Sequence, residues 1–179
     1  WFINLFNFMD GIDGIASVEA LTIGLGGAIL IVYTEGDQTT AIVGLILAAA
    51  SLGFLPSNWN PAKIFMGDTG STILGLMCGF ISIEMMAVND ILPLDEVYRI
   101  DSIPAVIVGI YIFPIFDTIR VFFIRVMRGN SPFKPDRRHI HHMLIDVGLS
   151  HFQATSLLVG VNFIFMFIVF KFQTIGAFY

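Results

Sequence analysis

Five apolar runs, each long enough to cross a lipid bilayer as a helix, are the feature that most constrains how this chain can fold. They cover roughly residues 15–34, 40–57, 69–88, 102–123 and 153–171. About 20 helical residues span a hydrocarbon core of about 30 Å, and polar or turn-forming residues bound each run. The sequence therefore predicts an all-α, polytopic integral membrane protein with about five transmembrane helices in one membrane domain, residues 1–179.

The composition excludes a soluble or disordered protein. Residues of the AVILMFWYC class make up 56% of the chain and only 13% are charged, which is about half the usual share. The single cysteine, Cys78, lies in an apolar run, so we expect it to be a buried packing residue. We expect no nucleic acid partner, although the net charge of -5 matters less here than the side of the bilayer on which each charge lies.

The loops between the runs fall on two sides of the membrane. Residues 1–14, 58–68 and 124–152 share one side, because two runs separate each loop from the next. That side has seven of the nine lysine and arginine residues, namely Lys63, Arg120, Arg125, Arg128, Lys134, Arg137 and Arg138. Arg99 and Lys171 belong to the other side. By the positive-inside rule, the side with seven basic residues is cytoplasmic.

The first cytoplasmic segment has four oxygen-bearing side chains at a spacing of three residues, Asn4, Asn7, Asp10 and Asp13. On a helix this spacing forms a slowly rotating stripe, and carboxylate and amide oxygens suit Mg²⁺. Other interpretations stay open. The glycines beside the aspartates are also typical of a calcium-loop fragment or a turn between helices, and the asparagines suit hydrogen bonds between helices.

The second segment places Asp68 at the mouth of the third run, within the small residues of 67–71. Small residues let a ligand approach the free N–H groups of a helix start, and such an end attracts phosphate. The alternative is a helix cap formed by Asp68 or Thr69, which is compatible with phosphate binding. Phe65 suits either stacking on a flat base or anchoring at the membrane interface.

The third segment is a histidine cluster, His139, His141 and His142, directly after Arg137 and Arg138. A transition metal is one candidate ligand, but no second set of cysteines or histidines completes a zinc site. The two arginines favour phosphate. A basic juxtamembrane loop that touches anionic lipid is the remaining alternative, which explains the arginines but not three histidines.

In this order the segments resemble the polyprenyl-phosphate N-acetylhexosamine-1-phosphate transferases of glycosyltransferase family 4. These include the peptidoglycan translocase and the bacterial enzymes that begin O-antigen and teichoic acid synthesis. Residues 4–14, NLFNFMDGIDG, are similar to the family's N-x-x-N-x-x-D-G-x-D-G segment. Residues 61–71, PAKIFMGDTGS, are similar to its P-A-x-x-F-M-G-D-x-G-S segment, and residues 131–142 to its basic histidine loop. The likeness extends over the whole chain.

The resemblance implies transfer of a sugar 1-phosphate from a UDP-sugar to polyprenyl (undecaprenyl) phosphate, with Mg²⁺ or Mn²⁺. This reaction would take place on the cytoplasmic face of a bacterial inner membrane and begin the assembly of a cell-surface polysaccharide such as lipopolysaccharide. Residues 135–142, PDRRHIHH, are similar to the GlcNAc-1-phosphate type rather than to the peptidoglycan translocase, whose loop has three consecutive histidines. This favours a UDP-N-acetylhexosamine, such as UDP-GlcNAc, as the donor.

The front of the chain departs from the family pattern. The family has about ten or eleven spans and an aspartate pair in its first half, and neither is found in these residues. The chain also begins with Trp1 and shows no signal peptide. We therefore expect a C-terminal half that needs an N-terminal half of the same protein as its partner and is inactive alone.

The predicted site combines the three segments. We expect Asp68 to bind the metal, with Asn7 and Asp10 holding it or its water, and the histidines with Arg137 and Arg138 to bind the phosphates. By resemblance, Asp13, Asn58 and Phe65 bind the nucleotide, and Asn4 and Lys63 join the substrate site. The expected catalytic residues are Asp10, Asp13, Asp68, His139, His141 and His142.

Two other classes compete with this prediction. A transporter or channel fragment would use intramembrane carboxylates to carry ions, but such proteins place them at the bilayer midplane, often in broken helices. Here they lie at the ends of the runs on one side. The other class is a lipid-binding membrane scaffold without catalysis.

Overall fold

The computed structural model describes residues 2–10, 13–33, 36–59, 61–93, 96, 99–129, 131 and 139–173. Within these residues the chain is built from helices, with no strand. The helices are α1 (Phe2–Met9), α2 (Ile15–Tyr33), α3 (Gln38–Asn58), α4 (Gly67–Asp90), α5 (Ile103–Ile110), α6 (Ile112–Met127), α7 (Ile140–Asp146) and α8 (His151–Lys171). The predicted all-α class is confirmed.

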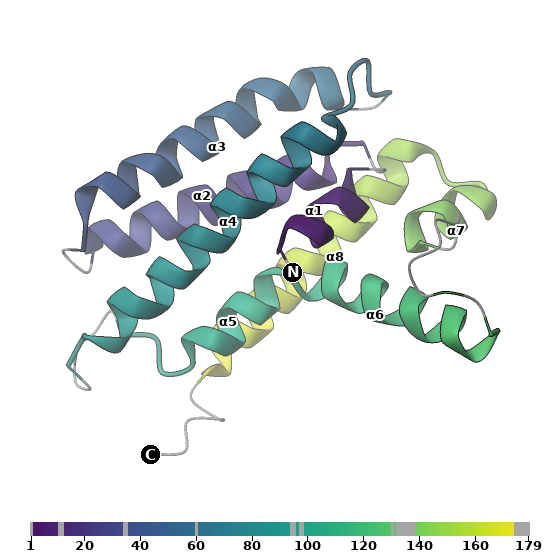
Figure 1. Ribbon diagram of the computed structural model, residues 1–179. Coiled ribbons are helices and arrows are strands. Elements are labelled where there is room, and N and C mark those ends of the chain that lie inside the picture. The colour runs from purple at the N-terminus through teal and green to yellow at the C-terminus, as the bar shows by residue number, and fades with distance from the viewer. Residues whose placement is uncertain are drawn as a thin grey trace.

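Four of these helices, α2, α3, α4 and α8, are long and apolar enough to cross a membrane. The bent pair formed by α5 and α6 brings the number of candidate spans to five if it counts as one. Figure 1 shows α2, α3 and α4 side by side, with α8 running beside α5. The prediction of a polytopic membrane protein with about five spans is confirmed.

The run at 102–123, predicted as one span, is not one continuous helix. It divides into α5 and α6, which meet at Tyr111 with a bend of 70°. The cause lies one turn further on, because Pro114 has no N–H to donate to the carbonyl of Ile110 and its ring crowds that carbonyl. After the bend α6 continues to Met127, into the loop predicted at 124–152.

Close helix contacts depend on small residues. A Cβ atom added at Gly24 in α2 would lie 2.6 Å from the carbonyl oxygen of Gly44 in α3. One added at Gly75 in α4 would lie 2.6 Å from the Cα atom of Ile3 in α1. Glycine therefore lets these backbones approach each other as helices in lipid do, and this contact seats α1 against the first half of α4.

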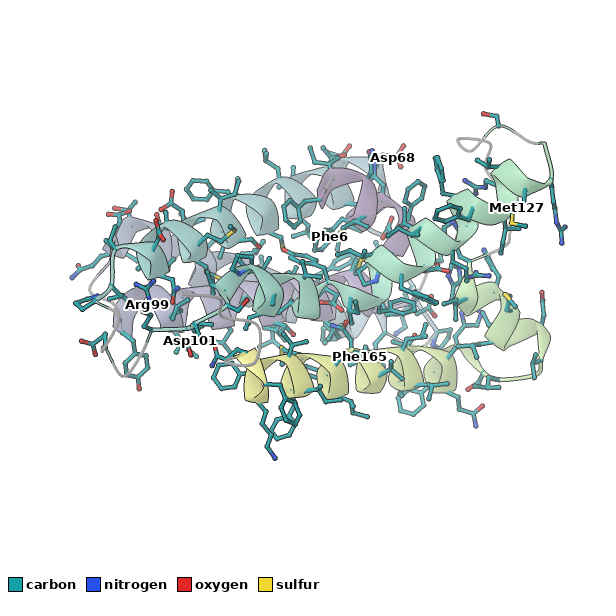
Figure 2. The ribbon with its side chains drawn as sticks, turned by 90° about the horizontal axis from the view of Figure 1, so that it is seen from below. Phe6, Asp68, Arg99, Asp101, Met127 and Phe165 are labelled. Carbon is teal, nitrogen blue, oxygen red and sulfur yellow. The ribbon has the colours of Figure 1, made fainter. Side chains whose placement is uncertain are left out.

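The predicted cytoplasmic loop 1–14 contains α1, whose faces differ. Leu5, Phe6 and Met9 are buried in the core, whereas Asn4 and Asn7 are exposed. Figure 2 shows Phe6 inside the bundle and Asp68 near the end that α6 approaches, with Arg99 and Asp101 at the opposite end. The polar stripe of α1 and the start of α4 therefore lie together, as the predicted topology requires.

Candidate active site

The start of α4 is capped by a carboxylate from α1. Asp10 Oδ2 accepts a hydrogen bond of 2.8 Å from the backbone N–H of Gly67, and Asp10 Oδ1 accepts one of 3.3 Å from that of Met66. Gly67 has a φ of 70°, which glycine adopts without strain. The alternative interpretation of the sequence, a cap formed by Asp68 or Thr69, is wrong. The N-cap residue is Met66, which makes no side-chain cap, and Asp10 meets the free N–H groups instead.

Asp68 is left with its side chain exposed in the first turn of α4. One turn further on, Ser71 donates a hydrogen bond to Asn7 Oδ1. The three predicted metal ligands, Asn7, Asp10 and Asp68, are thus brought together around the start of one helix.

The oxygen atoms of these three side chains suit Mg²⁺. The Asp10 oxygens accept one N–H each, and a carboxylate oxygen keeps a second acceptor position. Among the residues that the structure describes, no group of three or more His, Cys, Asp or Glu side chains is placed to hold a metal ion. Mg²⁺ is commonly bound by one or two carboxylates together with substrate phosphates and water, so two carboxylates and an amide suit Mg²⁺ when further oxygen ligands join them.

Two predicted nucleotide-binding residues hold the loop between α3 and α4 in place. Asn58 Nδ2 donates to the Ile64 carbonyl at 3.1 Å, and its Oδ1 accepts from the Gly14 N–H at 3.0 Å. Asp13 Oδ2 accepts from the Ala62 N–H at 3.0 Å and lies 3.7 Å from His151 Nδ1. Both side chains are buried, so they shape the loop, and their binding to the nucleotide stays a prediction.

The other predicted residues of this region, Asn4, Lys63 and Phe65, are all exposed. Arg137 and Arg138 lie outside the described residues.

The histidine segment is anchored on α6 by Asp117. His139 Nδ1 lies 2.8 Å from Asp117 Oδ2, and the backbone N–H of Ile140 donates to Asp117 Oδ1 at 3.1 Å. The Arg120 guanidinium donates to the same oxygen at 3.0 Å. Asp117 was not among the predicted site residues. A carboxylate inside an apolar run is itself a signal for function, and here it sets the position of His139.

His141 is buried among charged and titratable neighbours. Its side chain is 2% exposed, and neither ring nitrogen has a hydrogen-bond partner among the residues that the structure describes. Its ring centroid lies 4.0 Å from that of His142, which is only half-buried. Burial, together with the nearby His142 and His139, lowers the pKa of His141 to about 3. His141 is therefore neutral at physiological pH.

This lowered pKa predicts a loss of stability in acid. The unfolded histidine takes up a proton below its ordinary pKa of about 6.5, whereas folded His141 does so only near pH 3. The stability is therefore complete above about pH 6.5 and falls below it, by roughly 2 kcal/mol between pH 7 and pH 5. We expect unfolding midpoints in detergent to fall over this range, and to fall less in the His141→Phe variant.

The difference in this fall between the native protein and His141→Phe measures the contribution of His141 alone. The neighbouring titratable groups, which include His139, His142, His151 and Asp117, are present in both proteins. An equal decline in the native protein and in His141→Phe would show that His141 does not cause it.

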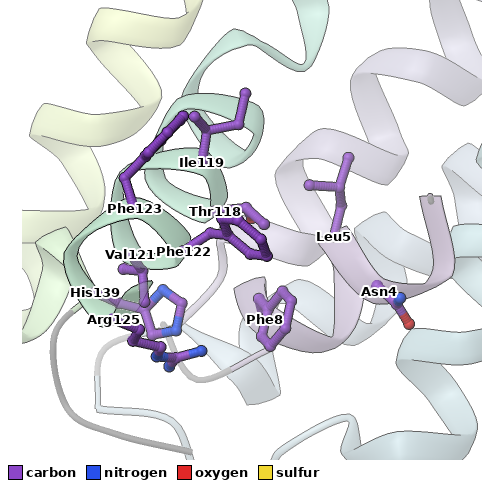
Figure 3. A pocket seen from close by; sticks show the side chains of 10 residues that line it. All are labelled: Asn4, Leu5, Phe8, Thr118, Ile119, Val121, Phe122, Phe123, Arg125 and His139. Carbon is purple, nitrogen blue, oxygen red and sulfur yellow. The ribbon is translucent and has the colours of Figure 1, made fainter. Parts of the chain in front are cut away.

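An apolar cavity of about 460 Å³ lies between α1 and α6. Figure 3 shows Arg125 and His139 together at one part of its wall and Phe8 beside them. The remaining lining residues are Asn4, Leu5, Thr118, Ile119, Val121, Phe122 and Phe123. We call this cavity the α1–α6 groove. The walls of the α1–α6 groove are mostly apolar, and the Arg125 guanidinium and the His139 imidazole lie together on one of them.

Arg125 was not among the predicted site residues, although the sequence holds a signal for it. Asp117, Val121 and Arg125 are buried and follow one another at a spacing of four residues, so they share one face of α6. Two charged residues on the inner face of an apolar helix are costly unless they are paired or functional.

Comparison with known proteins shows which family the sequence resembles. Residues 1–86 match the model of glycosyl transferase family 4. The chain is 36% identical to a decaprenyl-phosphate N-acetylglucosaminephosphotransferase of Mycolicibacterium smegmatis, over 87% of this chain and 41% of that protein.

Two further relatives come from other bacteria. A probable undecaprenyl-phosphate N-acetylglucosaminyl 1-phosphate transferase of Bacillus subtilis is 36% identical over 90% of this chain and 42% of that protein. An undecaprenyl-phosphate alpha-N-acetylglucosaminyl 1-phosphate transferase of Escherichia coli K12 is 32% identical over 87% and 41%. The chain spans about two fifths of the length of these relatives. By its sequence, its membrane helices and the family model, the chain belongs to glycosyl transferase family 4.

Proposed function

We propose that the protein transfers GlcNAc-1-phosphate, or a related N-acetylhexosamine 1-phosphate, from a UDP-sugar to polyprenyl phosphate and releases UMP. The observation that carries this proposal is the α1–α6 groove, whose apolar walls meet Arg125 and His139 (Figure 3). The names of the relatives support polyprenyl phosphate and N-acetylglucosamine as the groups that the reaction joins.

The α1–α6 groove suits an acceptor that joins a long apolar chain to a phosphate. Leu5, Ile119 and Phe122 offer contacts to prenyl groups, and the Arg125 guanidinium offers charge-assisted hydrogen bonds to phosphate oxygens. His139 uses Nδ1 toward Asp117, so its Nε2 is the nitrogen left for the phosphate.

The donor pyrophosphate then belongs at the start of α4. Asp68 and Asp10, with Asn7, offer oxygen ligands for Mg²⁺ or Mn²⁺, which when bound would neutralise charge on the phosphates. Phe65, which is 61% exposed, is available for stacking on uracil, and Lys63 is exposed nearby.

In the proposed reaction an oxygen of the acceptor phosphate attacks the phosphorus that bears the sugar. The bond from that phosphorus to the UMP oxygen breaks, so that UMP leaves with the electron pair and a new pyrophosphate joins the lipid to the sugar. The acceptor phosphate has a second pKa near 6 and is largely ionised at neutral pH, so a strong general base is not required. The residues of the chain hold the two phosphates in line and balance their charge.

We further propose that the site faces the cytoplasm from a bacterial inner membrane. The seven-to-two division of basic residues supports this orientation. The reaction would begin the assembly of a cell-surface polysaccharide. A transporter is less well supported, because the proposed metal ligands Asp10 and Asp68 lie where α1 ends and α4 begins, and not in the middle of a long helix.

The test measures transfer of label from UDP-GlcNAc to lipid in membranes that contain the complete native protein. The membranes receive Mg²⁺, undecaprenyl phosphate and UDP-GlcNAc that is labelled with ³²P in the β-phosphate and with ¹⁴C in the sugar. We expect both labels in extractable lipid at a constant ratio, with release of UMP. Sugar label in lipid without phosphorus label would show simple glycosyl transfer and contradict the proposal.

A second arm tests whether residues 1–179 suffice. We propose that they do not and that an N-terminal half completes the site, since the relatives are more than twice as long. We expect no transfer by residues 1–179 alone and recovery on co-expression with the preceding half, because separately inserted helices associate through packing. Transfer by residues 1–179 alone would end this part of the proposal.

A further inference from the structure

The break between α5 and α6 leaves backbone groups without helical partners inside the bundle. Pro114 cannot donate to the Ile110 carbonyl. The N–H of Phe113 points to a side chain instead of to a carbonyl of α5. Broken helices persist in membranes only where neighbouring groups satisfy the freed backbone.

One side chain from α8 meets both groups. Asn162 Nδ2 donates to the Ile110 carbonyl at 2.8 Å, and Asn162 Oδ1 accepts from the Phe113 N–H at 3.4 Å. Asn162 is buried, at 6% exposure. The amide therefore replaces, across the bend, a donor and an acceptor that a continuous helix would have supplied itself.

The orientation of this amide is fixed by α2. Asn162 Nδ2 also donates to Glu19 Oε1 at 2.6 Å, although the two residues are 143 positions apart. Glu19 is 3% exposed, and its second oxygen has no partner among the described residues. A carboxyl group buried among membrane-spanning helices costs free energy. The hydrogen bond from Asn162 Nδ2 to Glu19 Oε1 offsets part of this cost.

We propose that Asn162 and Glu19 are positioning residues that hold α6 at its angle to α5 and thereby shape the α1–α6 groove. Six residues of that groove, as well as Asp117, belong to α6. The 16 residues of α6 form a helix of about 24 Å, so a change of about 10° at Tyr111 moves its far end by about 4 Å. Such a shift would separate Arg125 and His139 from α1.

The geometric part of the proposal is tested without activity. Spin labels at Met127 and Ile46, which are 84% and 62% exposed, report the distance from the end of α6 to α3 in the complete native protein carrying Cys78→Ala. Asn162→Leu removes the amide with little change in volume, and we expect it to shift or broaden this distance by about 4 Å or more. Glu19→Gln, which keeps an acceptor for Asn162, should retain the native distance.

A double variant separates positioning from stability. Pro114→Ala restores an N–H for the Ile110 carbonyl, so Asn162→Leu combined with Pro114→Ala should recover thermal stability as a straighter helix while its label distance stays shifted. Ser51→Ala serves as the control, because this buried hydroxyl of α3 has no partner among the described residues and lies on another helix.

The kinetic part rests on the proposed function. For both Asn162 variants we expect the KM for polyprenyl phosphate to rise about tenfold or more, with an unchanged KM for the UDP-sugar. Native distances in Asn162→Leu, or native distance and KM in the double variant, would overturn the proposal. Absence of transfer by the native protein would instead overturn the proposed function, while the distance measurements still decide the role of Asn162.

Discussion

Asp68→Asn is expected to lower kcat for sugar-phosphate transfer by two orders of magnitude or more while the protein stays folded. Asp68 is exposed and does not cap α4, because Asp10 does so. The substitution therefore keeps the helix start and the side-chain shape, and removes one negative charge from the proposed metal site. A loss of this size is typical of a group that acts in the transition state.

The measurement is the initial rate across a magnesium titration, with thermal unfolding in detergent as the test of folding. Asp90→Asn is the matched control, since Asp90 is an exposed carboxylate at the opposite end of the same helix. We expect its rate to equal that of the native protein. Near-normal turnover by Asp68→Asn at every magnesium concentration would show that Asp68 is no metal ligand.

Asp117→Asn is expected to lower kcat/KM by about 100-fold. The carboxylate of Asp117 accepts hydrogen bonds from Arg120 and the Ile140 N–H and pairs with His139. Asparagine has one acceptor oxygen and an NH₂ group, so the NH₂ group would either face the Nδ1–H of His139 or force its proton onto Nε2, and the negative charge between His139 and Arg120 would be lost. Breaking a buried charged network in this way costs about 3 kcal/mol, which corresponds to about 100-fold if the loss falls on the transition state.

Asp146→Asn is the control for this variant, because Asp146 is an exposed carboxylate at the end of α7 without a role in anchoring His139. Rates should be compared at equal folded fraction, since the lost network also lowers stability. If Asp117→Asn retained native kcat/KM, the pairing of Asp117 with His139 would serve the fold alone.

The approximate number of spans and the limits of most of them could be predicted from the sequence. These properties depend on the length of the apolar runs, which is a local quantity. The start of α2 at Ile15 and its end at Tyr33 agree closely with the predicted run 15–34. The motif around Asp68 likewise led to the family that the comparisons show.

The tertiary structure decided which polar atoms serve the fold and which stay open to a ligand. Asp10 and Asp68 look alike in the sequence, yet Asp10 caps α4 while Asp68 is exposed. The sequence does contain Pro114, which signals a break, but the bend of 70° accompanies a contact between Asn162 and Glu19, 143 residues apart. Apolar periodicity records which face of a helix is buried, whereas hydrogen-bond partners from distant segments are set only when the helices pack.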